Sequence, residues 1–312
     1  MADERSQAER WVSFAAGIVT PITLISTLLF YFGYVSARSQ YEYFGIDVDT
    51  IGLSTQDYVM RSPQPLLLPL LGVTLLAVAA LLLHNAIHPT AVAVRRAARV
   101  AVAVLLLGVA GLLAYPVIGH LPYYALVIPA VIGLSAAALA YLTHLRQRTS
   151  PPQRVPPDST QSARPDPAQA VPPEPTRPAT SRSTPVLGQQ RVLIILLAFV
   201  TVVCTFWATA TTAQYSGRGL AKSDARHLNR FPVVILDTKE KLALRSPGLE
   251  ETALRQGAGQ TFNYRYRGLR LLVVGENRLF LVPQTWTPSN TTIVLPLDNN
   301  IRVQFQFEND PP

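Results

Sequence analysis

The sequence predicts an α-helical membrane bundle with five transmembrane helices, followed by a small all-β extracytoplasmic C-terminal domain. The first observation behind this fold class is a set of long uncharged apolar runs, since 49% of the 312 residues are hydrophobic and they cluster in a few segments. The second is an apolar–polar alternation of period two near the C-terminal end. The third is an uneven distribution of arginine between the loops, which predicts the orientation.

The run from Arg191 to Gln214 divides the chain into its parts. After its single arginine come 23 uncharged residues, which as a helix measure about 34 Å and cross a hydrocarbon core of about 30 Å. A polar, proline-rich segment precedes this run, and a mixed polar domain follows it. The run therefore decides which compartment each of them occupies.

Four further apolar runs precede this one. Residues 100–145 contain no Asp, Glu, Lys or Arg, and as one helix they would measure about 69 Å, so the chain must fold back. Tyr115-Pro116 and the stretch Gly119-His120-Leu121-Pro122 mark the break. The predicted spans are residues 11–35, 66–86, 100–118 and 122–145.

The first run, residues 11–35, has a competing interpretation as a cleaved signal peptide. Val35-Ser36-Ala37 offers small residues of the kind that a signal peptidase accepts. The apolar run is about twice as long as the usual signal core of about 7–15 residues, which favours a span. Pro21 is expected to bend this helix without ending it, because neighbouring helices satisfy the freed carbonyl. The polar residues 1–10 form a cytoplasmic N-terminus.

The polar loop at residues 36–65 contains too many apolar side chains for a flexible connection. We expect one or two short helices in it, and the stretch from Ser54 to Asp57 has the composition of a helix cap. This loop and the C-terminal domain come out on the same face of the membrane, so we predict that they pack together. Tyr43 and Phe44 are candidates for a ligand or partner surface.

Residues 146–190 form a predicted disordered cytoplasmic linker. They contain 11 of the 26 prolines of the chain, with Ser, Thr, Gln and Arg between them. This composition cannot bury a core and favours an extended tether of polyproline type.

Residues 215–312 form the predicted extracytoplasmic β domain, after a short juxtamembrane stretch. Gly275-Glu276-Asn277 is a hairpin signal, and Asp298-Asn299-Asn300 supplies a second turn. About seven short strands suggest a small β-sandwich or barrel of roughly 80 residues. The predicted strands are Val233–Leu236, Lys241–Leu244, Phe262–Arg267, Leu269–Val274, Leu279–Val282, Thr292–Leu295 and Ile301–Phe307.

The arginines predict the sidedness of the chain. Eleven of them fall in the N-terminus, the loop after the second span and the proline-rich linker, and Arg191 directly after the linker makes twelve, whereas only Arg38 and Arg61 fall in the short loops of the other side. Positive residues favour the cytoplasmic side, which places the C-terminal domain outside. The bias of 24 Arg to 3 Lys is typical of a GC-rich bacterial genome, so we expect a bacterial plasma membrane.

Several function classes are not expected. The net charge of +8 is explained by arginines that flank apolar runs, so no nucleic-acid partner is predicted. Charged residues are missing at mid-membrane depth, which argues against an ion-coupled transporter. The single cysteine, Cys204, allows no intrachain disulfide or cysteine metal cluster. No familiar nucleotide-binding or hydrolase motif occurs, so neither an enzyme nor a cofactor is expected.

Three histidines are candidate metal ligands. His84 and His88 stand one helical turn apart, and His144 falls at a similar depth in another span, so together they could bind zinc or a haem iron. The alternative is that they are polar caps where helices leave the bilayer, since no carboxylate nearby in sequence would orient them.

Two arginines are candidate contacts for anions. Arg265 and Arg267 share one face of a predicted strand and could meet phosphate-bearing lipids or anionic wall polymers. The alternative is a solvated face above an aromatic core.

The loop Tyr41–Met60 and the segment YRYRGLRLLV (Tyr264–Val273) resemble parts of uncharacterised actinobacterial multi-pass membrane proteins. This resemblance implies a lineage and no mechanism. We expect a non-enzymatic envelope component that senses or scaffolds through its outer domain, with the lipid bilayer and membrane or envelope proteins as partners. The alternatives are an accessory subunit of a transporter or channel, and a membrane-embedded metal or haem protein that uses the three histidines.

Overall fold

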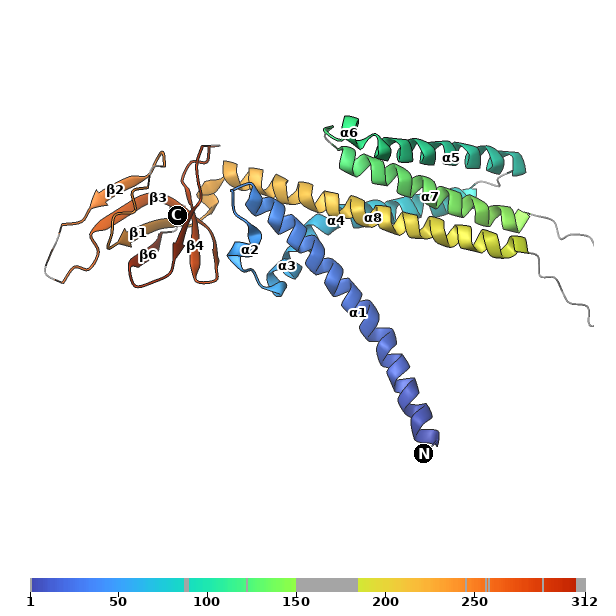
Figure 1. The fold of residues 1–312 in the computed structure, drawn as a ribbon, viewed down its shortest axis with the longest axis horizontal. Coiled ribbons are helices and arrows are strands. Elements are labelled where there is room, and N and C mark those ends of the chain that lie inside the picture. The colour runs from blue at the N-terminus through green and yellow to red at the C-terminus, as the bar shows by residue number, and fades with distance from the viewer. Residues whose placement is uncertain are drawn as a thin grey trace, which may run out of the picture. The chain divides into compact units, whose positions relative to one another are not determined.

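The computed structural model describes residues 2–86, 90–121, 123–149, 185–244, 246–255, 257, 259–287 and 289–306 of the chain. It divides into two compact units, of which one comprises residues 1–81 and 208–312 and the other residues 82–207. Helices come first along the sequence and strands last (Figure 1). The helices are α1 (Ala2–Glu42), α2 (Val48–Ile51), α3 (Thr55–Arg61), α4 (Pro63–Ala86), α5 (Ala91–Leu113), α6 (Tyr115–Ile118), α7 (Tyr124–Thr149) and α8 (Pro185–Arg226), followed by a 3-10 turn at Leu228–Arg230.

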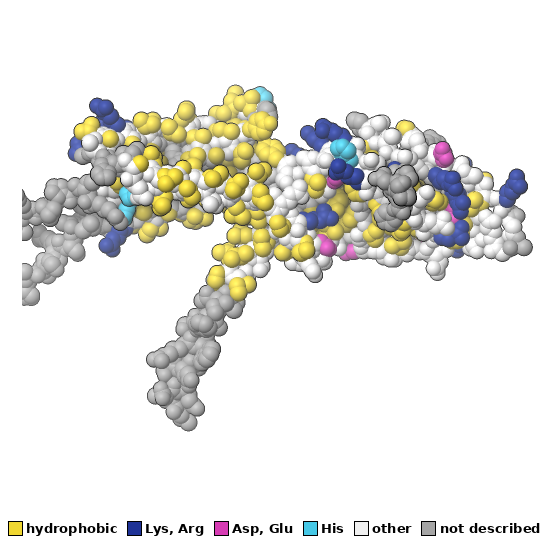
Figure 2. Space-filling model, turned by 180° about the vertical axis from the view of Figure 1, so that it is seen from behind, with side chains coloured by type: hydrophobic (Ala, Val, Ile, Leu, Met, Phe, Trp, Pro, Cys, Tyr) yellow, Lys and Arg dark blue, Asp and Glu magenta, His cyan; other side chains and the backbone are white. Residues whose placement is uncertain are grey.

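Within the described residues, four helices are long and apolar enough to cross a membrane. They are Pro63–Ala86, Val92–Leu113, Tyr124–Leu145 and Gly188–Arg226. Hydrophobic side chains cover the surface of these long helices in Figure 2, as contact with lipid requires. The coarse prediction of apolar, membrane-length helices together with a β domain is thereby confirmed.

The helix predicted at residues 100–118 has different ends in the structure. It begins at Ala91, because the hydroxyl of Thr90 accepts a hydrogen bond from the amide of Ala93 at 3.3 Å and caps the first turn. It ends at Leu113, and Ala114 separates it from the short helix α6, whose first turn contains Pro116, a position at which a helix tolerates proline. The predicted fold-back thus occurs, a few residues earlier than expected.

The first predicted span, residues 11–35, lies within α1, which continues through Pro21 without a break. The predicted linker is helical at both ends, because α7 extends to Thr149 and α8 begins at Pro185. The prediction for residues 150–184 lies outside the described residues.

Small residues let α5 and α7 approach closely in the second unit. A Cβ added at Gly108 would lie 2.8 Å from Cγ1 of Ile132. Ala98 and Ala101 of α5 pack with Leu139 of α7 in a small buried cluster. This is the kind of packing by which helices associate in lipid, where no hydrophobic force brings them together.

The β domain is one antiparallel sheet. The strand order is β5-β4-β3-β1-β6, with β2 paired to the same central β3. The prediction of a sandwich or barrel was therefore wrong for the described strands. The strands are β1 (Val233–Thr238), β2 (Glu250–Ala253), β3 (Tyr264–Gly275), β4 (Arg278–Pro283), β5 (Ile293–Pro296) and β6 (Ile301–Gln306).

Gly268 explains why two predicted strands are one. Its φ of +85° lets the backbone bend within β3 while pairing continues on both sides of the bend. The strands predicted separately at residues 262–267 and 269–274 are therefore one long strand, which begins at Tyr264. The hairpin predicted after it is confirmed, with Glu276 and Asn277 both at positive φ as a two-residue turn of this type requires.

The predicted strand Lys241–Leu244 was also wrong. Ala243 has a φ of +48°, and the amide of Leu242 donates to the hydroxyl of Tyr266 at 2.8 Å instead of to a neighbouring strand. Four exposed residues, Glu250–Ala253, pair with β3 instead. They escaped prediction because they carry no apolar–polar alternation.

Both faces of β4 are buried. Leu279 and Leu281 pack in a cluster formed by the sheet and its loops, whereas Phe280 and Val282 pack in a second cluster that includes helical residues. Alternate residues of a strand point to opposite faces, so this sheet has a core on each side. The second core positions the candidate site.

Candidate functional site

One face of the sheet is covered by helices from the two chain segments of the first unit, namely α1, α2 and α3 from the first segment and the end of α8 from the second. We call this region the joint. It confirms the prediction that residues 36–65 pack against the β domain. Its buried members are Ala37, Tyr41, Phe44, Ile46, Val48, Ile51, Tyr58, Ala221, Leu228, Leu272, Phe280 and Val282.

Backbone contacts and ring contacts hold the loop and the sheet together. The hydroxyl of Thr292 donates to the carbonyl oxygen of Phe44 at 2.6 Å. The ring of Phe44 meets the indole of Trp286 edge to face, with centroids 5.0 Å apart. A Cβ added at Gly275 would lie only 1.9 Å from the carbonyl oxygen of Ile51, so strand and helix backbones touch there. The predicted helix cap is confirmed as well, since Ser54 and Asp57 form a capping box at the start of α3.

The joint also holds α1 against the end of α8. A Cβ added at Gly217 would lie 2.1 Å from the carbonyl oxygen of Ser36, so the two helices meet at their backbones. Ala213 and Ala221, one turn to either side of Gly217, are fully buried. Small residues at this spacing give the close approach.

Polar side chains link α3, α1 and α8 beside this contact. Gln40 donates from Nε2 to Oδ2 of Asp224 at 2.8 Å. Arg61 donates to Oε1 of Gln40 at 3.2 Å and to the hydroxyl of Tyr41 at 2.9 Å. Burial raises the pKa of the Tyr41 phenol, so it accepts this hydrogen bond as a neutral hydroxyl. The polar groups near the joint thus satisfy one another.

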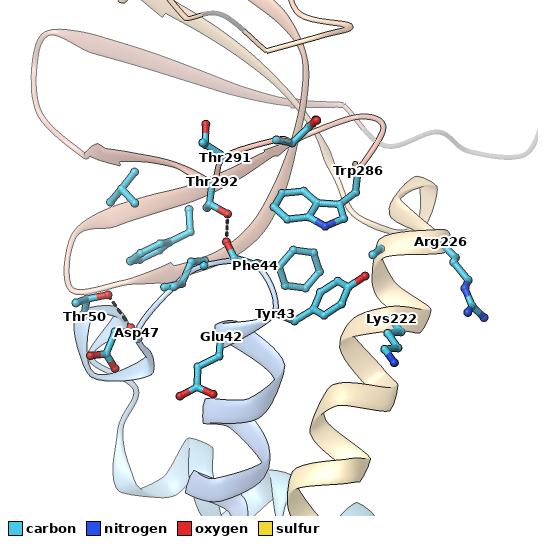
Figure 3. Close-up of a pocket in the computed structure, with 16 residues that line it drawn as sticks. Glu42, Tyr43, Phe44, Asp47, Thr50, Lys222, Arg226, Trp286, Thr291 and Thr292 are labelled. Carbon is cyan, nitrogen blue, oxygen red and sulfur yellow. Dashed lines mark hydrogen bonds between the residues drawn. The ribbon is translucent and has the colours of Figure 1, made fainter. Parts of the chain in front are cut away.

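A groove of about 1070 Å³ opens at the edge of the joint (Figure 3). It lies between the turn after α1, the last turns of α8 and the segment around β5. The lining residues are Glu42, Tyr43, Phe44, Gly45, Ile46, Asp47, Thr50, Lys222, Ala225, Arg226, Phe280, Trp286, Asn290, Thr291, Thr292 and Val294.

Aromatic rings form the centre of the groove. Figure 3 shows Tyr43, Phe44 and Trp286 gathered between the strands and α8. Phe44 is buried, whereas 39% of Tyr43 is exposed. Of the two aromatic residues singled out from the sequence, Phe44 is therefore mainly a core residue, and Tyr43 is partly exposed in the lining of the groove.

The charged groups of the groove differ in how they are satisfied. Glu42 accepts from Nε of Arg38 at 2.8 Å, and Asp47 caps α2 by accepting from the amide of Asp49 at 3.2 Å. Lys222 and Arg226 stand one turn apart on α8, and neither makes an ion pair with any described residue. Figure 3 shows the guanidinium of Arg226 directed away from the rings, on the other side of α8.

The predicted stripe of Arg265 and Arg267 divides into two different environments. Arg265 donates to Asp237 through Nε at 2.7 Å and through Nη2 at 3.1 Å, whereas Arg267 is exposed. Asp237 is fully buried and also accepts from Nε of Arg302 at 3.0 Å. The hydrogen bonds from Arg265 hold the pKa of the Asp237 carboxyl below its usual range, although burial opposes them. Arg265 is thus engaged inside the domain.

The predicted histidine site is only partly described. His84 and His144 are exposed, and a ring nitrogen of His84 is hydrogen-bonded with the hydroxyl of Tyr141. His88 lies outside the described residues. The described part of the chain gathers no group of three potential metal ligands, and the metal hypothesis stays a prediction.

No known family model, curated protein or solved structure matches this chain. The joint and the groove are therefore the features of this chain that bear on function. Sequence reasoning missed Lys222, Arg226 and Trp286. The signal for the two cations was their spacing, since Arg218, Lys222 and Arg226 recur every four residues directly after the last apolar run.

Proposed function

We propose that this chain is a non-enzymatic component of a bacterial cell envelope, which senses or scaffolds through its β domain. In this proposal α1 supplies a fifth transmembrane span at residues 11–35. The bias of arginines places the N-terminus and the linker in the cytoplasm, and the β domain and groove outside the plasma membrane.

The joint is the observation that supports this function. The buried cluster continues from the sheet through α2 to residues of α1 and α8. Both of these long helices lead from the joint into apolar runs. Packed interiors transmit displacement because they have few voids. A partner or ligand that moves the β domain therefore moves two membrane helices with it, which a flexibly linked domain could not do.

Reporter fusions test the proposed topology. A fluorescent protein and alkaline phosphatase are fused at residue 92, within residues 150–184 and at the C-terminus. We expect fluorescence from the first two positions and phosphatase activity from the third. Phosphatase activity from the linker fusion would overturn the orientation.

Distance measurements test the mechanical part. Spin labels are placed at Ile25 of α1 and at Asn299, which lies in the exposed turn before β6, in a Cys204→Ser background. Pulsed electron paramagnetic resonance of the full chain in lipid nanodiscs should give one narrow distribution of distances between the two spin labels. A broad distribution would show that the β domain moves independently of α1 and would remove the basis for sensing through the joint.

A further inference from the structure

We infer that the groove binds an anionic sugar, a carbohydrate unit with a carboxylate or phosphate, held at the outer membrane surface. This inference deepens the proposed function and rests on the extracytoplasmic placement proposed there.

The charges favour an anion. The two carboxylates of the lining are engaged within the protein, Glu42 by Arg38 and Asp47 by the start of α2. Lys222 and Arg226 have no such partner among the described residues, and both are exposed. One oxygen of each carboxylate is thus paired within the protein, whereas the side-chain donors of Lys222 and Arg226 are available to an anion. Charge-assisted hydrogen bonds to an anion are the strong contacts that this arrangement offers.

The rings and hydroxyls favour a sugar. The C–H face of a sugar ring packs on an aromatic face, and Tyr43 and Trp286 offer such faces in the centre of the groove (Figure 3). The hydroxyls of Tyr43 and Thr291 make no hydrogen bond with a described residue, and each can pair with a sugar hydroxyl. The groove, at about 1070 Å³, reaches the upper end of the range of about 300–1,000 Å³ for ligand pockets, so it has room for more than one ring.

The position along α8 separates a sugar from an ordinary phospholipid. Lys222 and Arg226 come 8 and 12 residues after Gln214, the last residue of the apolar run. At about 1.5 Å per residue they stand about 12 and 18 Å beyond it, whereas the headgroup layer is only about 5–7 Å thick on each side. Arg218, at about 6 Å, is level with phospholipid phosphates. The groove therefore faces groups that project above them, as sugars do.

Titration of the full chain tests the inference. Trp11 and Trp207 are replaced by Phe, so that Trp286 is the single tryptophan and can be excited selectively, and the protein is placed in phosphatidylcholine nanodiscs. Glucose 1-phosphate and glucuronate are titrated against glucose and inorganic phosphate, with calorimetry in parallel in case the indole emission does not respond. We expect both anionic sugars to bind at least about tenfold more tightly than glucose or phosphate, as one charge-assisted hydrogen bond gives.

Matched variants locate the binding. Lys222→Gln with Arg226→Gln should weaken glucose 1-phosphate binding by about tenfold or more, and Arg218→Gln on the same helix should change it less than about twofold. Near-ultraviolet circular dichroism of each variant checks that the joint remains folded. Equal affinity for glucose, equal affinity for inorganic phosphate, or no loss in the double variant would each overturn the inference.

A further titration in nanodiscs of a different lipid composition distinguishes a glycolipid from a soluble sugar. Nanodiscs that contain a glycolipid with glucuronate at the outer end of an oligosaccharide headgroup should reduce the binding of free glucose 1-phosphate if the natural ligand is a glycolipid headgroup. Unchanged binding there would assign the groove to a soluble sugar, which keeps the inference. Failure of every sugar to bind would remove the inference, whereas the proposed function would still stand on the reporter and distance results.

Discussion

Replacing Phe44 by Ala should loosen the β domain from the helices. The side chain is 2% exposed, and removal of a buried Phe costs about 3–5 kcal/mol. Of this, the edge-to-face contact with Trp286 accounts for about 0.5–1.5 kcal/mol. At about 1.4 kcal/mol per tenfold change, opening of the joint should become roughly 10² to 10³·⁵ times more frequent. The hydrogen bond from Thr292 goes to the backbone of Phe44, so the substitution tests the ring alone.

Hydrogen exchange measures this opening. The amides of β4 and α2 are followed by mass spectrometry in nanodiscs, in the wild type and in Phe44→Ala. Met60→Ala is the control, because Met60 lies on the neighbouring α3 with 74% of its surface exposed. Exchange of β4 should accelerate in Phe44→Ala and remain as in the wild type in Met60→Ala. Unchanged exchange in a folded Phe44→Ala protein would refute the idea that this ring fastens the domain.

The remaining predictions concern the helix contact, a buried carboxylate and a cap. Gly217→Ala should lower the melting temperature, since the new methyl group meets the α1 backbone and overpacking costs about 1–3 kcal/mol. Gly219→Ala is the control, because a Cβ there has no atom within 4 Å. This variant should be neutral or up to about 1 kcal/mol more stable. Asp237→Asn should destabilise the domain at pH 7 by about 1–3 kcal/mol. Since Arg265 lowers the pKa of Asp237, its contribution is complete above an unfolded-state pKa of about 3.9 and is lost as pH falls through the lower folded value. The variant should therefore lose less stability than the wild type on acidification in that range. Ser54→Ala should cost about 1 kcal/mol in α3, measured as faster amide exchange in that helix.

Each of these predictions has an outcome that contradicts it. Equal melting temperatures for the two glycine variants would show that α1 and α8 do not meet at Gly217. An acid-unfolding curve for Asp237→Asn that superimposes on that of the wild type would remove the assigned role of the carboxylate. Amide exchange in α3 that is indifferent to Ser54→Ala would mean that packing, and not the cap, holds that helix.

Features that depend on length and local periodicity could be predicted from the sequence. The apolar runs predicted the membrane-length helices, and the excess of apolar residues at 36–65 predicted that this loop packs against the β domain. The capping box at Ser54 was visible because its chemistry lies within four consecutive residues.

Features that depend on distant partners could not be predicted. The bend at Gly268 joins two strands only because β1, β2 and β4 pair along β3. The sequence also gave no sign that Arg265 would be engaged by Asp237, which lies on another strand. The groove escaped prediction for the same reason, because Lys222 and Trp286 are 64 positions apart and converge only through the joint.

The hydrogen bond between Thr292 and Phe44 spans 248 positions of the chain, and this separation has a consequence for biosynthesis. At about 5–20 residues per second, a ribosome needs roughly 12–50 seconds to supply the second partner after the first. During most of that interval the apolar side chains of α2 and its flanking turns have no strand to cover them, because β3 and β4 are made late in it. A nascent chain stalled before β3 is therefore expected to be a target for chaperones or quality-control proteases.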